Sequence, residues 1–209
     1  MTNNAEQAAE PTSSPRNAEQ MIALLRDVFE RRGADSYLGE DVTMSQHMLQ
    51  SAALAAAAGL DDAVVAGALL HDIGHYINDF PESLGATQDR RHQLSGAAIL
   101  DGWFPQRTVA CVRGHVGAKR YLCAIEDGYL HALSDASIES LALQGGPMSP
   151  SECDEFAQSE HLEAMLSVRR FDDAGKDPKL QVPTFSAYMP MLEHLVRTQL
   201  ESPTAATRT

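Results

Sequence analysis

Two histidines of this chain lie four residues apart at the end of an apolar run, in the stretch GALLHDIGHYI from Gly67 to Ile77. They are His71 and His75, and Asp72 directly follows the first. An unpaired carboxylate is expensive to bury, and coordination of a metal ion is one way to offset that cost. On a helix, residues four apart share a face, so the two imidazoles are expected to point the same way. The pattern indicates a metal site.

Three further histidines each fall in a different expected helix or at a helix edge: His47, His92 and His115. Helical bundles commonly build metal sites from inward-facing side chains on separate helices. Each of these imidazoles can therefore supply one ligand to a centre shared with the HD pair. An isolated histidine is more often a structural or solvated side chain. That interpretation applies to the histidines that no motif surrounds: His131, His161 and His194.

The elements that would position these residues are helices almost throughout. Apolar spacing, cap residues and breakers predict helices over 18–33, 43–59, 61–75, 92–104, 105–116, 118–125, 133–146, 149–176 and 185–202. Residues 78–90 are rich in breakers and predict a loop. The last helix should be irregular at Pro190, because proline lacks an amide donor. With no alternating run long enough for a strand, the expected fold is an all-α bundle.

The composition restricts the class of protein. A chain of 209 residues suits one domain, expected over 17–201, between a disordered lead-in over 1–16 and a loose tail over 202–209. Its formal charge of -13 argues against a surface that neutralises nucleic-acid phosphates or anionic lipid. We therefore expect no nucleic-acid or membrane partner. An anionic substrate must meet a local cation or a metal.

Location is inferred from absent signals and from the cysteines. No apolar run approaches the roughly 20 residues that span a bilayer, and the first residues have no apolar signal core. The three cysteines, Cys111, Cys123 and Cys153, form no CxxC pair and suit a reducing compartment. The expected location is the cytoplasm.

The order of His47, His71, Asp72 and a late Asp172 resembles the H...HD...D pattern of the HD-domain superfamily of metal-dependent enzymes. The resemblance implies an HD-domain helical bundle with a metal site in its core. Many members of the superfamily are phosphohydrolases, in which a metal-bound water attacks a phosphate ester.

His92 and His115, between the HD pair and the last aspartate, match the pattern of members that hold two metals. The resemblance implies that the site is dinuclear and that Asp72 bridges the two ions. It places His47, His71 and Asp172 around one metal, and His92 and His115 on the other. The motif RRFDDAGK contains a second candidate for the last ligand, Asp173.

Four segments carry a narrower resemblance: RRGADSYLGEDVTMSQH, VRGHVGAKRYLC, LSDASIESLALQGGPMS and RRFDDAGK. From about Arg31 to Lys176 the chain is similar to the phosphonate-cleaving mixed-valence diiron oxygenases of the HD superfamily, including the enzymes for trimethylated substrates. The resemblance implies two iron ions, Fe(II)/Fe(III), with O2 as co-substrate. The implied reaction cleaves the C–P bond of a 1-hydroxy-2-aminoethylphosphonate, and a separate hydroxylase would supply this substrate. Imidazole and carboxylate suit iron and also accept manganese or zinc.

The same resemblance implies contacts with the substrate. His75 and Lys119 would hold the phosphonate, with Ser137 as a further contact, while Tyr37 and Glu40 would cover the amine. A carboxylate beside an aromatic ring suits an ammonium group, whether free or methylated. The implied catalytic residues are His71, Asp72, His75 and Lys119. Without the motifs around them, a lysine such as Lys119 is more often solvated, a serine such as Ser137 is more often a helix or cap hydroxyl, and YLGE would be a helix-to-loop turn.

Two other functions are compatible with the sequence. One is a metal-dependent phosphohydrolase that acts on a small phosphate ester or nucleotide. The other is a degenerate binding module that keeps the fold for sensing a small molecule. The complete set of six candidate ligands argues against the binding module.

Overall fold

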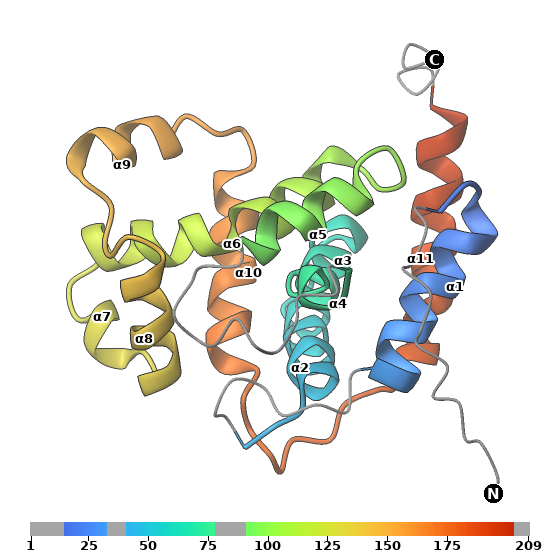
Figure 1. Cartoon of the computed structure of the whole chain (residues 1–209), viewed down its shortest axis with the longest axis horizontal. Helices are drawn as coiled ribbons and strands as arrows, with labels where there is room; N and C mark the ends of the chain where they lie inside the picture. The colour runs from blue at the N-terminus through green and yellow to red at the C-terminus, as the bar shows by residue number, and fades with distance from the viewer. Residues whose placement is uncertain (1–14, 33–40, 78–90, 203–209) are drawn as a thin grey trace, which may run out of the picture.

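The described part of the chain is helical. The structure, a computed structural model, describes residues 15–32, 41–77 and 91–202, and no strand is present within these ranges (Figure 1). The helices are α1 (Ala18–Asp27), the π-helical turn η1 (Val28–Arg32), α2 (Met44–Ala57), α3 (Asp62–Leu70), α4 (Gly74–Ile77), α5 (His92–Leu100), α6 (Gln106–Ile125), α7 (Tyr129–Ala132), α8 (Asp135–Leu143), α9 (Pro150–Phe156), α10 (Leu162–Ala174) and α11 (Phe185–Glu201). The all-α prediction is confirmed.

Helix α3 lies at the centre of the bundle. Its sequence DAVVAGALL is apolar on nearly every side, which is typical of a buried helix. It packs against α2, α6 and α10, while α1 and α11 lie side by side at one end of the molecule (Figure 1). The main core runs through these helices and includes Leu25, Met48, Leu69, Phe104 and Leu192.

A smaller apolar cluster lies where α6, α7 and α8 meet. Leu122, Tyr129, Leu133 and Leu141 form its buried part. Ser134 caps α8 by accepting a hydrogen bond from the Ser137 amide. This cluster holds α8 beside α6, close to the candidate site described below.

The helix predicted over 61–75 is wrong in one respect, because it is two helices with a turn between them. Helix α3 ends at Leu70, His71 is its C-cap, and α4 begins at Gly74. At this end of the helix the His71 ring donates from Nδ1 to the Ala68 carbonyl oxygen at 2.8 Å. A Cβ on Gly74 would lie 1.9 Å from the His92 carbonyl oxygen, so the turn brings α4 against the start of α5.

Other boundaries differ for similar packing reasons. The segments predicted over 105–116 and 118–125 form the single helix α6, in which Gly114 packs so closely that a Cβ would lie 2.0 Å from Met165 Sδ. The segment over 149–176 divides into α9 and α10, and α7 was not predicted. Helix α11 continues through Pro190, which lies on its exposed side, where water can satisfy the carbonyl left without a donor.

Several predictions fall outside the described residues. They include residues 1–14 of the lead-in, 203–209 of the tail, the whole loop predicted over 78–90, and both residues assigned to the amine, Tyr37 and Glu40. The domain boundaries at 17 and 201 therefore stay predictions. Within the described ranges, no helix has both the length and the apolar character that crossing a bilayer requires.

Candidate metal centre

The six residues of the HD pattern meet in one buried cluster at the centre of the bundle. They come from four helices and the turn after α3: His47 from α2, His71 and Asp72 from that turn, His92 from α5, His115 from α6 and Asp172 from α10. Each is at most 9% exposed. Helices distant in sequence therefore bring imidazoles and carboxylates to one place.

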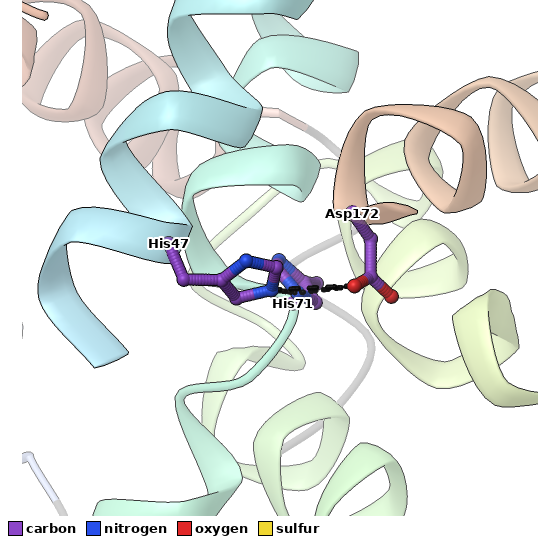
Figure 2. Close-up of side chains that lie close together, drawn as sticks. All are labelled: His47, His71 and Asp172. Carbon is purple, nitrogen blue, oxygen red and sulfur yellow. Dashed lines mark hydrogen bonds and ion pairs between the residues drawn. The ribbon is translucent and has the colours of Figure 1, made fainter. Parts of the chain in front are cut away.

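The first candidate metal position lies between α2, α3 and α10. His47 Nε2 is 3.0 Å from His71 Nε2 and 3.2 Å from Asp172 Oδ1. Figure 2 shows these three side chains converging from separate helices. Their potential ligand atoms all lie within 4.8 Å of one another, so the group can hold a metal ion.

The second candidate position lies between α5 and α6. His92 Nε2 is 3.0 Å from His115 Nε2, and the two atoms are 3.2 and 3.4 Å from Asp72 Oδ1. His75 is adjacent, with its ring stacked on that of His92 at a centroid distance of 4.1 Å. Ligand atoms of Asp72, His75 and His92 also lie within 4.8 Å of one another.

Asp72 lies between the two positions and faces both. Its Oδ1 is directed at His92 and His115, whereas its Oδ2 is 3.4 Å from His71 Nε2 and 3.7 Å from His47 Nε2. One carboxylate thus offers a different oxygen to each group of imidazoles. This is the geometry of a carboxylate that can bridge two ions.

Backbone carbonyls determine which ring nitrogens carry protons. The Nδ1 atoms of His47, His71 and His115 lie 2.8 to 2.9 Å from the carbonyl oxygens of Gly175, Ala68 and Val112, in that order. A carbonyl only accepts, so each Nδ1 is a donor and each neutral ring keeps its lone pair on Nε2. These Nε2 lone pairs point into the cluster, where a metal ion would accept them.

Two buried carboxylate oxygens also lack hydrogen-bond donors. Asp72 Oδ2 and Asp172 Oδ1 accept no hydrogen bond from the residues that the structure describes, although they are shielded from water. Such groups are rare in folded proteins, and an ion is one of the few explanations. Nitrogen and oxygen donors in this arrangement suit first-row transition metals, so the residues present fit a pair of such ions.

The charges in the cluster shift the pKa values of the imidazoles in opposite directions. Burial opposes protonation of His71, but Asp72 and Asp172 outweigh it and raise the pKa of His71 to about 9. For His115, burial dominates and lowers the pKa to about 4. Without a cation, the site therefore retains a proton on one ring at neutral pH.

Arg169 is a site residue that the sequence did not reveal. It is 3% exposed, and its Nη1 donates to Asp172 Oδ2 at 2.6 Å, which leaves Oδ1 directed at the histidines. The same guanidinium pairs with Asp173, which also accepts a hydrogen bond from the Tyr129 hydroxyl. Asp172 therefore faces the imidazoles and Asp173 faces Arg169 and Tyr129. The available signal was spacing, since an arginine three and four residues before two aspartates meets both on a helix.

The residues assigned to the phosphonate lie beside the cluster. The His75 side chain is 16% exposed, and burial, followed by repulsion from His92, lowers its pKa to about 3. A neutral imidazole offers one N–H donor and no positive charge. Burial likewise lowers the pKa of Lys119 to about 8, so this ammonium is still charged at neutral pH. Ser137 is buried at the start of α8.

Comparison with known proteins agrees with this geometry. The HD domain family matches residues 44–151. The chain is 43% identical over 189 residues to a [1-hydroxy-2-(trimethylamino)ethyl]phosphonate dioxygenase (glycine-betaine-forming) of Leisingera caerulea, covering 90% of this chain and 96% of the relative. It is 36% identical over 171 residues to a hydroxymethylphosphonate dioxygenase of Gimesia maris, covering 81% and 85%.

A third relative is an uncharacterised protein of Acanthamoeba polyphaga mimivirus, 32% identical over 166 residues, with 77% of this chain and 76% of the relative covered. The family match spans the segment that carries five of the six clustered residues, all but Asp172, and the first relative covers 90% of the chain. The chain belongs to the HD domain family.

Proposed function

We propose that this protein is an oxygenase that cleaves the C–P bond of a 1-hydroxy-2-aminoethylphosphonate whose amine is free or N-methylated. The observation that carries the proposal is the 43% identity to a phosphonate dioxygenase over 96% of that relative's length. The Asp72 geometry supports it, because the carboxylate lies between two groups of imidazoles.

The proposed reaction needs no reductant other than the substrate. One O2 and one 1-hydroxyphosphonate contain the atoms of one carboxylic acid and one inorganic phosphate. The hydroxyl-bearing carbon is oxidised to the carboxyl level and both oxygen atoms are reduced. With an aminoethyl substrate the acid is glycine, or glycine betaine when the amine carries three methyl groups.

Six residues would hold the metal pair: His47, His71 and Asp172 at the first position, His92 and His115 at the second, and Asp72 between them. When bound, a pair of iron ions as Fe(II)/Fe(III) would supply the redox chemistry that activates O2. The surrounding residues keep the site dry and keep the Nε2 lone pairs directed inward, through the backbone acceptors of the Nδ1 protons.

The phosphonate would lie between the second position and the start of α8. Lys119 follows His115 by four residues on α6, so its ammonium is on the same face of that helix. It supplies the positive charge that an acidic protein surface does not. His75 would donate one N–H to a phosphonate oxygen, and Ser137 would donate its hydroxyl proton.

The amine would lie at the far end, under Tyr37 and Glu40. An aromatic ring and a carboxylate attract ammonium groups at every methylation level, through cation–π and charge interactions. The two named relatives differ at this end of their substrates, because one substrate carries a trimethylamino group and the other is hydroxymethylphosphonate. We further propose that the reaction takes place in the cytoplasm and follows a separate hydroxylase that makes the 1-hydroxyphosphonate.

The test is phosphate release by iron-loaded protein in air, with oxygen uptake followed in parallel. The substrates are 2-amino-1-hydroxyethylphosphonate, its N-trimethyl analogue and hydroxymethylphosphonate. We expect one phosphate for each O2 consumed, and the relative rates rank the amines. Hydrolysis of phosphate esters without oxygen uptake, together with inactivity on all three phosphonates, would instead assign the protein to the phosphohydrolases.

A further inference from the structure

Three serines recur at every third position at the start of α8: Ser134, Ser137 and Ser140. Residues three apart are neighbours on a helix surface, so the three hydroxyls lie along one side. Two ammonium groups from other elements reach this side. Lys119 Nζ donates to Ser140 Oγ at 2.7 Å, and Lys176 Nζ donates to Ser137 Oγ at 3.0 Å and to Ser134 Oγ at 3.2 Å.

The hydroxyl protons of Ser137 and Ser140 differ in whether they have an acceptor. Ser140 accepts from Lys119 and donates to the Ser137 carbonyl oxygen at 3.1 Å, so both its donor and an acceptor are used. Ser137 accepts from Lys176, but within the described part of the chain its own O–H proton has no acceptor. Because Ser137 is only 6% exposed, this donor is largely shielded from bulk water. The Ser137 O–H group is therefore free to donate to an oxygen of a bound ligand.

Lys119 has spare donors on the same side of α8. An ammonium carries three N–H groups, and among the described residues only Ser140 accepts one of them. Among the described residues Lys119 forms no ion pair, although Asp172, Asp173 and Asp72 attract its charge from further away, and it is 3% exposed. A buried ammonium and a buried hydroxyl with unused donors are together suited to a tetrahedral oxyanion.

Lys176 joins this group to the metal centre. It directly follows Gly175, whose carbonyl oxygen accepts the Nδ1 proton of His47 at 2.9 Å. A Cβ on Gly175 would lie 2.7 Å from Ser51 Oγ and 3.1 Å from the His47 carbonyl oxygen, so the backbone there is held against α2. The position of the Lys176 backbone is thereby fixed relative to the first metal position.

We propose that Lys176 is a specificity-determining residue of the phosphonate subsite. Its ammonium occupies a lone pair of Ser137 Oγ and so turns the Ser137 proton toward a bound oxyanion. It also adds a second positive charge to that of Lys119, which favours a doubly charged phosphonate over a singly charged sulfonate. This inference rests on the proposed function, because it identifies the substrate's anionic end.

The test compares binding of methylphosphonate and methanesulfonate, which lack the reacting hydroxyl, to metal-loaded protein by calorimetry. Replacing Lys176 with methionine should weaken the binding of methylphosphonate by about 10- to 100-fold, the range for losing a charge-assisted hydrogen bond. The binding of methanesulfonate should weaken less, so the ratio of the two affinities falls. Lys176→Arg should keep part of this discrimination, because arginine retains the charge. Lys179→Met, which changes an exposed lysine nearby, should leave both affinities unchanged.

The role of Ser137 is tested by a double-mutant cycle. Lys176→Met should cost less affinity in a Ser137→Ala background than in the wild type, because the hydroxyl that Lys176 orients is then absent. Additive losses would overturn the orienting role, and unchanged methylphosphonate binding in Lys176→Met would overturn the subsite assignment. Loss of bound metal in Lys176→Met would also overturn it, in favour of a structural role near His47.

The probes bind without turnover, which separates the two proposals. Lys176-dependent phosphonate binding by a protein that oxidises no phosphonate would count against the proposed reaction alone. Normal turnover with Lys176-independent binding would count against this inference alone.

Discussion

His47 and His71 face each other with their Nε2 atoms 3.0 Å apart, while both rings donate their Nδ1 protons to backbone carbonyls. Two lone pairs at that distance repel unless a cation or a proton lies between them. In the absence of metal, Asp72 and Asp172 outweigh burial and raise the pKa of His71 to about 9, so this ring is expected to carry a second proton at neutral pH. The metal-free and metal-bound proteins should therefore differ in protonation.

Metal removal should give the protein a new dependence of stability on pH. The pKa of His71 rises from 6.5 to about 9 on folding without metal, because the neighbouring carboxylates outweigh burial. Stability from this group is complete below pH 6.5 and is lost as pH rises through about 9. The melting temperature of chelator-treated protein should fall from pH 7 to 9, while that of metal-loaded protein changes less. If the melting temperatures of the two forms changed in parallel with pH, His71 would not be protonated in the metal-free protein.

Asp72→Ala should abolish binding of both metals, because each candidate position uses one of its two oxygens. The measurement is metal content after loading and desalting, by elemental analysis. Asp173→Asn is the matched control, since Asp173 faces Arg169 and Tyr129 and is expected to leave both metals bound. A full pair of ions in Asp72→Ala would refute the bridging role.

Arg169→Lys should weaken metal binding at the first position by about 10- to 100-fold, the usual effect of losing the partner of a ligand. A lysine keeps the charge but cannot hold Asp172 and Asp173 together as the guanidinium does. Competition with a chelator of known affinity measures the change. Arg170→Lys is the control, because Arg170 is more exposed and pairs with Glu126. If Arg169→Lys and Arg170→Lys changed metal affinity equally, Arg169 would have no specific role at the metal site.

The kcat/KM for phosphonates should fall as pH rises above about 8. Burial lowers the pKa of Lys119 to about 8, and only its protonated form attracts the phosphonate. The limiting fall is about tenfold per pH unit, the slope for one essential proton. Lys119→Met should raise KM and remove this limb of the profile. An unchanged KM in Lys119→Met would exclude the ammonium from phosphonate binding.

Glu40→Gln should raise KM for ammonium-bearing substrates and leave hydroxymethylphosphonate unaffected, because only the former carry the charge that the carboxylate attracts. An increase of about 10-fold is expected for one charge-assisted contact. Asp41→Asn, an exposed neighbour, is the control. If Glu40→Gln changed KM for both substrate classes equally, the carboxylate would not recognise the amine.

The clustering of the HD residues could be predicted from residue type and order, because few roles other than metal binding suit so many buried imidazoles and carboxylates. The fold class followed from helical periodicity. The break between His71 and His75 could not be predicted, since it depends on contact between Gly74 and the backbone of α5, a segment distant in sequence. The prediction that the two rings share one helix face was wrong for this reason, although both rings reach the cluster.

The supporting residues were harder to predict than the clustered ones. Arg169 carries no signal in the sequence beyond its spacing from two aspartates, and its importance comes from burial. Lys176 and Ser134 are distant in sequence and meet through tertiary packing, and the apolar cluster that holds α8 follows from no local pattern. Such contacts depend on tertiary packing, which local patterns do not encode.

His115 and Lys119 are four residues apart on α6, a helix that runs without interruption from Gln106 to Ile125. Their separation along the axis is therefore set by backbone geometry, at about 6 Å. For the proposed reaction, a substrate that inserts a methylene between its hydroxyl carbon and its phosphorus would have to give up one of these contacts. Redesign of the protein toward 2-hydroxyphosphonates would then require a different register along α6, because no exchange of a pocket side chain alters that spacing.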